Sequence, residues 1–253
     1  IAVPTTLAEM YDAAVKLTDA GANRYGFGLR GGPGGQYTIL NIMEAFGSPV
    51  LHEDGSTGLD RDKAIEGIKY FADMAKNAAP PSAPNDGFRQ IIEGFQTGQT
   101  AMISHHTGSY QDIASKLKPG VEFGTMAIPA GPAKRVARLA YAYNSITKPE
   151  DADAAWKWIK FWGEPDAAVA FLEKTGYFPA STTAAQDERI GGNPMYAAAS
   201  ETLGFGIPQP SFPGAAGWAE STVLPAFQRV LIGEATPEQA VDEMIAGLAE
   251  ATS

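Results

Sequence analysis

The chain has 253 residues, 44% of them hydrophobic and 19% charged, a globular composition with room for one large domain or two smaller ones. Its formal net charge of −10 argues against a nucleic-acid partner, because such partners require basic surfaces. The chain has no cysteine, which excludes structural disulfides and cysteine-ligated metal sites. The sequence also lacks a run of about 18 apolar residues, so no membrane-spanning segment is predicted.

Helix and strand patterns alternate along the first half of the chain. Thr6 and Glu9 form a capping box ahead of an apolar face, and Gly21 follows it, which predicts a helix between them. The later patterns predict a strand over 25–29, a helix over 38–46, a short hairpin within 47–60, helices over 62–77 and 88–95, a strand over 100–104, a helix over 112–117 and a strand over 122–128. This alternation predicts an α/β three-layer lobe.

The second half is mostly helical by its pattern. A strand is predicted over 139–147, followed by helices over 152–162, 165–174, 197–203, 219–231 and 237–249. Thr236, Pro237 and Gln239 supply the cap, the first-position proline and the capping-box partner of the last helix.

Residues 99–110 are the most informative stretch. The strand pattern over 100–104 runs directly into His105, His106, Gly108 and Tyr110. Ligands in α/β proteins bind at the carboxyl ends of strands, so polar groups and an aromatic ring at this point predict a small-molecule site.

Several motifs resemble those of extracellular solute-binding proteins of ABC importers, in the carbohydrate-binding branch of that family that includes maltose-binding protein. The segment 95–103, Phe-Gln-Thr-Gly-Gln-Thr-Ala-Met-Ile, is similar to the family's F-x-x-G-x-x-A-M signature. Residues 4–18 resemble its P-x-T-W-x-E-L helix, with Leu7 in place of the usual Trp. The strand over 25–29 and the turn Gly176-Tyr-Phe-Pro179 follow in the family's order, so the resemblance covers nearly the whole chain.

The resemblance implies a type II periplasmic-binding-protein-like fold, an α/β fold with two lobes joined by a hinge. It assigns residues 1–134 and 190–253 to the second lobe and 135–189 to the first. Most of the first lobe, roughly 100 residues and an ordinary domain's worth, is then expected upstream of Ile1. Without that segment, the strand edge of 135–189 and the helix carrying Trp156 and Trp162 would expose apolar surface.

The glycine-rich segment 30–37 is a candidate binding loop. It lacks the Lys-Ser/Thr of a P-loop, and Pro33 breaks the G-x-G-x-x-G pattern, so it does not predict a nucleotide site. We predict a flexible loop in which Arg30 donates two hydrogen bonds to a ligand oxygen pair. The resemblance implies that Tyr37 faces the ligand. The alternative is a plain turn with Tyr37 in the core.

The adjacent histidines do not form an obvious metal site. On an extended segment they point to opposite sides, and the chain has only His52 besides, so no metal is predicted. We expect one of the pair, His106, to face the ligand and the other to pack. The family commonly has a stacking Trp near Gly108, and its absence here makes Tyr110 the candidate replacement.

Two further aromatic residues follow from the resemblance. Tyr177 lies in a turn that brings an aromatic ring to the ligand, and Trp218 is expected to stack on it, because an amphipathic ring suits the apolar face of a sugar. Burial in the core is the alternative for Trp218, as for Phe178 beside Tyr177. Trp156, Trp158 and Trp162 share a helix with Ile159 and Phe161 and are expected to be core residues.

Enzyme signatures are absent: the sequence has neither G-x-S-x-G nor H-E-x-x-H, and no cofactor is implied. The predicted function is capture of a carbohydrate without chemistry, followed by delivery to an ABC permease. A periplasmic or extracellular protein, associated with the membrane through its transporter, is therefore expected. A carbohydrate-active enzyme and a binding protein for a non-sugar solute remain the alternatives.

Overall fold

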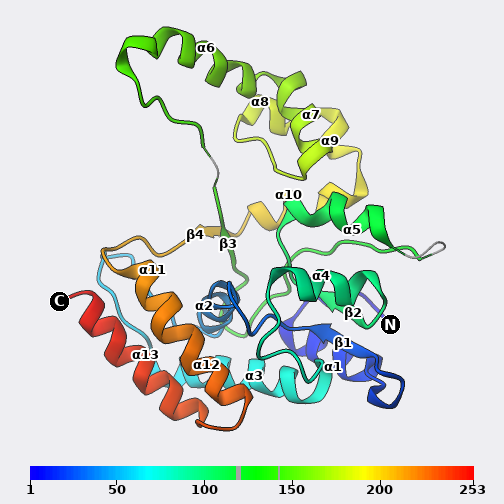
Figure 1. Ribbon diagram of the computed structural model, residues 1–253, viewed down its shortest axis with the longest axis vertical. Coiled ribbons are helices and arrows are strands. Elements are labelled where there is room, and N and C mark those ends of the chain that lie inside the picture. Colours follow the sequence, from blue (N-terminus) through cyan, green and yellow to red (C-terminus); the bar gives the residue numbers. More distant parts are fainter. Residues whose placement is uncertain (118–120, 142) are drawn as a thin grey trace. The chain divides into compact units, whose positions relative to one another are not determined.

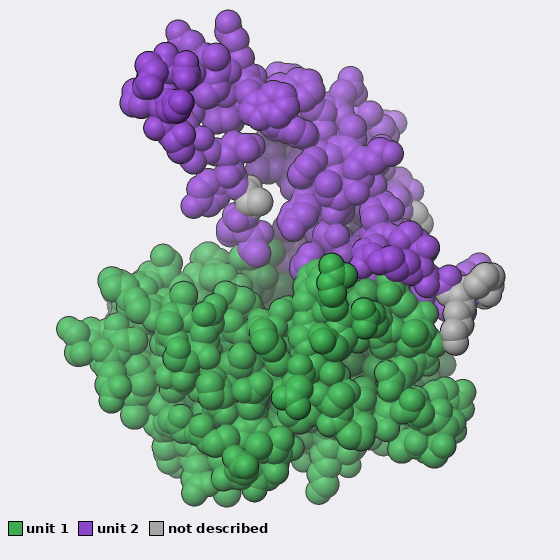
Figure 2. Space-filling model, in the orientation of Figure 1, with its two compact units in different colours: residues 1–104, 128–139, 205–253 green, residues 105–127, 140–204 purple. Residues whose placement is uncertain are grey.

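The computed structural model describes residues 1–117, 121–141 and 143–253 (Figure 1). The chain divides into two compact units, coloured separately in Figure 2. Unit 1 comprises Ile1–Ser104, Ile128–Leu139 and Phe205–Ser253, and unit 2 comprises His105–Ala127 and Ala140–Gly204. Each unit is therefore assembled from segments that are distant in sequence.

Unit 1 is an α/β arrangement with two small parallel sheets. Strand β1 (Tyr25–Gly28) pairs with β2 (Thr100–Ile103), and β3 (Ala137–Leu139) pairs with β4 (Gly206–Pro208). Around them lie the helices α1 (Leu7–Leu17), α2 (Gln36–Ala45), α3 (Arg61–Ala78), α4 (Phe88–Gln96), α11 (Ala215–Trp218), α12 (Leu224–Leu231) and α13 (Pro237–Ala251), with a 3-10 turn η1 (Ala20–Ala22) and a π-helical turn η4 (Ala219–Val223).

The capping motifs form where the sequence predicts them. The Thr6 side chain accepts from the Glu9 backbone N–H at 3.2 Å, and Glu9 Oε2 accepts from the Thr6 N–H at 3.2 Å. Thr236 and Gln239 make the same reciprocal pair at α13. Helix α1 stops at Leu17 instead of continuing toward Gly21, because Asp19 caps the separate turn η1.

The core of unit 1 is built on α3. Phe71 of α3 stacks on Phe227 of α12 with ring centroids 5.4 Å apart, and both side chains are fully buried. Helix α3 also packs against α2 and α13. Gly26 in β1 lets the strand approach α1, since a Cβ there would lie 1.8 Å from the Ala14 carbonyl oxygen.

Unit 2 is helical in its described part. It contains η2 (Thr107–Ser109), α5 (Tyr110–Lys116), η3 (Pro149–Asp151), α6 (Ala152–Gly163), α7 (Pro165–Thr175), α8 (Thr182–Ala185), α9 (Glu188–Gly191) and α10 (Pro194–Leu203). Its hydrophobic cluster is small and consists of Val169, Leu172, Ile190 and Tyr196, with Phe178 packed against it.

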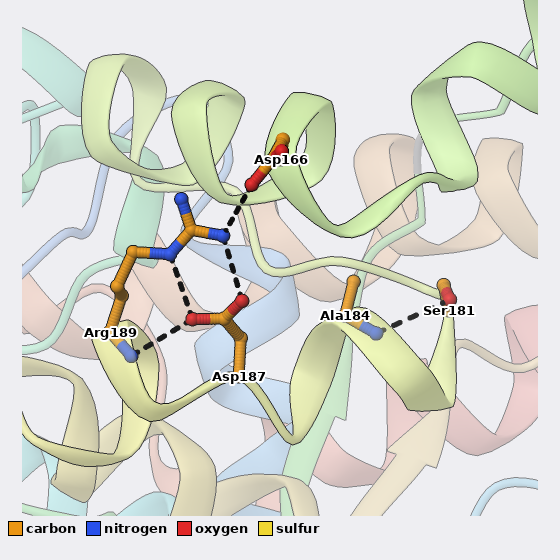
Figure 3. Close-up of polar contacts among 5 residues, drawn as sticks. All are labelled: Asp166, Ser181, Ala184, Asp187 and Arg189. Carbon is orange, nitrogen blue, oxygen red and sulfur yellow. Dashed lines mark hydrogen bonds and ion pairs between the residues drawn. The ribbon is translucent and has the colours of Figure 1, made fainter.

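An arginine joins two helices of unit 2. Arg189 of α9 donates to Asp187 Oδ2 at 2.7 Å and reaches Asp166 of α7 at 2.9 Å, as Figure 3 shows. The Asp187 side chain also caps α9 by accepting from the Arg189 backbone N–H at 2.9 Å. The contact between Arg189 and Asp166 thus links α9 to α7 on the exposed side of the unit.

Two predicted strands are wrong. Residues 122–128 form no strand, and of the described part of 139–147, which excludes residue 142, only Leu139 belongs to one, as the last residue of β3. A strand persists only where a neighbour accepts its backbone hydrogen bonds. Among the described residues, β4 gives that pairing to 137–139 alone.

Helix α6 is exposed instead of forming core. None of its residues is buried, and Trp156, Trp158 and Phe161 are each more than half exposed. The rings cover one another: Trp162 lies 5.4 Å from Trp158 and 5.0 Å from Phe171 of α7. The core position expected for the tryptophans is therefore wrong in this chain, while the apolar exposure expected for this helix is observed.

The unit boundaries differ from those of the predicted segments. Residues 135–139 lie in unit 1, whereas 190–204 and 105–127 lie in unit 2 with 140–189. Their assignment to the lobes of a longer protein stays a prediction.

Candidate functional site

The glycine-rich loop holds Arg30 against its own backbone. Arg30 Nε donates to the Pro33 carbonyl oxygen at 2.7 Å, and the guanidinium lies 5.8 Å from the centre of the Phe88 ring. The loop is anchored on the turn that precedes α4, since the N–H groups of Gly31 and Gly32 donate at 2.9 Å to carbonyl oxygens there. The loop predicted to be flexible is thus tied down by backbone hydrogen bonds.

Tyr37 follows the loop in the first turn of α2 and is 43% exposed, so the predicted alternative of a core tyrosine is wrong. Its phenol is close enough to influence Arg30: burial lowers the pKa of Arg30, and Tyr37 opposes that shift. Arg30 and Tyr37 therefore form one group, which also includes Phe88. Phe88 carries no binding motif, and the sequence analysis did not identify it as a site residue.

In unit 2 the two histidines lie beside Ser109. The hydroxyl of Ser109, which is buried, lies 2.7 Å from His105 Nδ1 and 3.4 Å from His106 Nε2. His105 is half-buried and His106 is exposed. Ser109 was not identified from the sequence, since a serine in a turn gives no signal of its own.

Tyr177 lies next to His106. Their ring centroids are 6.3 Å apart and nearly parallel, and Tyr177 is 46% exposed. Gly108 leaves space for this pair, because a Cβ there would lie 3.0 Å from both His106 Nδ1 and Tyr177 Cε2. Gly176 packs on the same turn, with the position of its missing Cβ only 2.1 Å from the Thr107 carbonyl oxygen. The backbone at the end of α7 thus packs directly against the backbone of the turn Thr107–Ser109, which follows the two histidines.

Tyr110 and Trp218 take other positions. Tyr110 is half-buried, with its ring between Phe123 at 5.4 Å and Tyr196 at 6.2 Å. Trp218 is 4% exposed, and its indole N–H donates to the Met244 carbonyl oxygen at 2.9 Å. Trp218 is therefore a core residue, which was the alternative prediction. The predicted stacking on a ligand does not fit so buried a ring.

The predicted residues therefore fall into two exposed groups and two packed rings. The Arg30 group lies in unit 1 and the His106 group, with Tyr177, lies in unit 2. Both groups combine an aromatic face with nitrogen atoms that form hydrogen bonds: the Arg30 guanidinium donates, and the His106 ring can donate or accept. Among the described residues, no cluster of three His, Asp or Glu side chains is placed to hold a metal ion. No helix in the described parts of the chain is long and apolar enough to cross a membrane.

Solved structures of similar fold are solute-binding proteins. A maltose-bound protein of T. maritima superposes with a TM-score of 0.80 at 20% identity, covering 98% of this chain and 66% of that one. A ribitol complex of an ABC transporter solute-binding protein from Agrobacterium radiobacter K84 gives 0.78 at 24% identity, covering 99% and 65%. A tagatose-bound protein from Thermotoga lettingae gives 0.80 at 21%, covering 98% and 64%. These similarities confirm the predicted type II periplasmic-binding-protein-like fold.

Sequence comparison agrees. A putative binding protein of Brucella abortus (strain 2308) is 25% identical over 251 residues, which are 96% of this chain and 60% of the relative. A putative binding protein of Brucella suis biovar 1 matches to the same extent. The chain thus spans 60% of the length of these curated relatives. The model of the family described as bacterial extracellular solute-binding protein matches residues 1–169, and the chain belongs to this family.

Proposed function

We propose that this chain is the larger part of the solute-binding component of an ABC importer and that its solute is a carbohydrate. The observation that carries the proposal is the pairing of an exposed tyrosine with a fixed hydrogen-bond donor, Tyr37 with Arg30. A sugar presents an apolar C–H face to a ring and hydroxyl groups to donors, so this combination suits it. The maltose, tagatose and ribitol in the similar structures belong to the same chemical class.

The proposed mechanism is capture without bond making or breaking. Two lobes of the complete protein close around the solute by hinge bending, and the closed form is recognised by the permease. The second lobe would be formed by 1–134 and 190–253, with an upstream segment completing the first. The protein would act in the periplasm or outside the cell, held at the membrane through the permease.

We propose ligand contacts for each of the two exposed groups within its own unit. In unit 1 Tyr37 offers a ring and Arg30 a polar contact, and in unit 2 Tyr177 and His106 offer the same combination. Tyr110, which is half-buried, would contribute the exposed part of its side chain. We leave Trp218 out of this set, because its ring is buried and its N–H is already bonded.

A carbohydrate-active enzyme is the competing proposal. The one serine beside histidine in the candidate groups is Ser109, and its hydroxyl is buried, so a substrate carbon cannot reach it without rearrangement. The family to which the chain belongs is one of binding proteins. Both points favour capture.

The test is a thermal-shift screen of the longest form of the protein that its gene encodes, against sugars, polyols and amines. A ligand at about 100 times its Kd adds about 2.7 kcal/mol of stability, enough to raise Tm by several degrees. Tyr37→Ala and Tyr177→Ala should reduce the shift, whereas Tyr143→Ala, an exposed ring outside both groups, should not. A response to amines alone would contradict the carbohydrate proposal, and new reducing ends on incubation with oligosaccharides would contradict capture without chemistry.

A further inference from the structure

Arg30 is positioned by the loop that follows it. Its Nε is used internally, in the 2.7 Å bond to the Pro33 carbonyl oxygen. Gly34 has φ +89°, and a Cβ at that position would lie 1.9 Å from Arg30 Nη2. Gly35 lies close to the Arg30 backbone, because a Cβ at position 35 would be 2.2 Å from the Arg30 carbonyl oxygen. The loop therefore wraps the guanidinium: a side chain at Gly34 would displace the Arg30 side chain, and one at Gly35 would meet the Arg30 backbone.

The two Nη groups of Arg30 remain available. They carry four N–H donors, and no described residue accepts from them. The phenyl ring of Phe88 and the exposed ring of Tyr37 are the neighbours instead. Because Nε is held by the Pro33 carbonyl oxygen, the two Nη groups are the donors that Arg30 can offer to a ligand.

The charge of Arg30 has no acidic partner among the described residues. The buried Arg138 does have one, Glu44, and even the exposed Arg189 pairs with Asp187. The acid nearest in the loop's contacts, Asp86, accepts from Ser82 Oγ at 2.9 Å, and burial raises its pKa. Partial burial of an uncompensated cation is costly, which favours an anion supplied from outside.

We propose that Arg30 binds a pair of negatively charged oxygens on the solute, so that the captured carbohydrate is an acidic one. A guanidinium fork matches a carboxylate or phosphate with two parallel hydrogen bonds, a geometry that a lone hydroxyl does not fill. Tyr37 would then face the sugar ring that carries the acid. The inference rests on the proposed function, because it specifies the solute of the same site.

Calorimetric titration of the longest encoded form of the protein tests this with matched pairs of probes. D-galacturonate and D-glucuronate are compared with D-galactose and D-glucose, and glucose 6-phosphate separates phosphate from carboxylate recognition. We expect the acidic sugars to bind at least about 10-fold more tightly and their affinity to fall with added salt.

Variants assign the difference to Arg30. Arg30→Gln should weaken acidic sugars by about 10- to 100-fold and neutral sugars by only about 2- to 5-fold, because neutral sugars lose hydrogen bonds to hydroxyl groups but no charge pair. Arg30→Lys should lose less, since it keeps the charge but not the fork. Arg61→Gln removes the same charge from an exposed pair with Asp242 and should change neither. Melting curves without ligand establish that each variant is folded.

The outcomes separate the two proposals. Equal binding of acidic and neutral sugars, or equal loss of both in Arg30→Gln, would overturn the acidic-solute inference and keep carbohydrate capture. Absence of binding to all five probes, with a response to amines or other solutes, would overturn carbohydrate capture and the inference with it.

Discussion

Gly34 shows how one residue without a side chain controls another. Its φ of +89° favours glycine, and so does that of Gly55, at +83°. The difference lies in the surroundings: a Cβ at Gly34 meets Arg30 at 1.9 Å, whereas nothing lies within 4 Å of a Cβ at Gly55. Substitutions at Gly34 and Gly55, compared with each other, therefore separate the cost of backbone strain from the cost of displacing Arg30.

Gly55→Ala should cost about 1–2 kcal/mol of unfolding free energy, the strain of a left-handed alanine. Gly34→Ala should cost about 1 kcal/mol more, because Arg30 must leave its hydrogen bond to Pro33. Urea denaturation measures both. In an Arg30→Gln background the excess should disappear, and an undiminished excess would show that Arg30 is not the group displaced.

Asp187 gives a prediction about acid stability. The Arg189 guanidinium lowers the pKa of Asp187 to about 2, with the Arg189 backbone N–H adding to the effect. A folded-state pKa below the unfolded one means that this stability is present at neutral pH and is lost as pH falls from about 4 toward 2. Asp187→Asn should therefore flatten the loss of unit 2 stability over that window, while keeping an oxygen to cap α9.

The control for Asp187 is its neighbour Asp166. The Asp166 side chain contacts the same guanidinium at 2.9 Å but is 94% exposed, so water screens the interaction. Asp166→Asn should leave the acid profile near that of the unmodified chain. Thermal melting between pH 2 and pH 6, followed by helical circular dichroism, compares the three proteins. A profile unchanged by Asp187→Asn would contradict the assignment.

The sequence could identify candidate aromatic rings but could not tell which of them are exposed. Tyr37 and Trp218 are both amphipathic, and either could face a sugar or a core. What separates them is the Met244 carbonyl oxygen, 26 positions beyond Trp218, which accepts the indole hydrogen bond. Such a partner is fixed by tertiary packing, so the sequence pattern left the two possibilities open.

Among the elements, helices with capping residues were predictable and short strands were not. Caps are local: the groups of Thr6 and Glu9 that bond to each other are three residues apart. Strand β4 is only Gly206-Ile-Pro208 and owes its existence to β3, nearly 70 positions earlier. Partners so distant leave no periodic signal in so few residues.

The same pair of strands is fixed to α2 by a buried charge pair. Arg138 of β3 contacts Glu44 of α2, with side chains 5% and 8% exposed, and also donates to the Pro208 carbonyl oxygen of β4 at 3.2 Å. Lys134 reaches the other Glu44 oxygen at 2.7 Å. Burial lowers the pKa of Arg138, and Glu44 opposes that shift. Glu44 thus compensates two cations.

Glu44→Gln should destabilise unit 1 by about 3–5 kcal/mol, because it leaves Arg138 buried without an acid. Asp242→Asn, which breaks the exposed pair with Arg61, should cost less than about 1 kcal/mol. Combining Glu44→Leu with Arg138→Met should recover much of the stability, since neither charge then remains buried. Chemical denaturation gives all three values. A Glu44→Gln cost as small as that of Asp242→Asn would refute the proposed anchoring.

For the whole molecule, the sequence predicted two parts but not their limits. The chain passes between units after Ser104, Ala127, Leu139 and Gly204. Stretches with several prolines and glycines, 129–132 and 204–214, lie at two of these points, but none marks the passages after Ser104 and Leu139. The Pro-rich stretch 78–86 instead lies inside unit 1, where it supports the Arg30 loop. Composition alone therefore could not locate all the points at which the chain passes from one unit to the other.

The two units should differ in stability against local opening. Unit 1 has α3, α12 and α13 around fully buried Phe71 and Phe227, while unit 2 depends on its four-residue cluster and leaves α6 without a buried side chain. Protection of backbone amides follows buried apolar contact. Hydrogen exchange followed by mass spectrometry should therefore show α6 exchanging first and α3 last.

Two variants at neighbouring positions test whether the small cluster of unit 2 determines the order in which the helices exchange their amide hydrogens. Leu172→Ala removes a fully buried side chain from the unit 2 cluster and should accelerate exchange across α7 to α10 while leaving α3 unchanged. Phe171→Ala, one position earlier and 41% exposed, should act mainly on α6, whose Trp162 it contacts. Equal acceleration of α3 by Leu172→Ala would mean that the chain opens as one cooperative body, because only then could a cavity in unit 2 reach the core around Phe71.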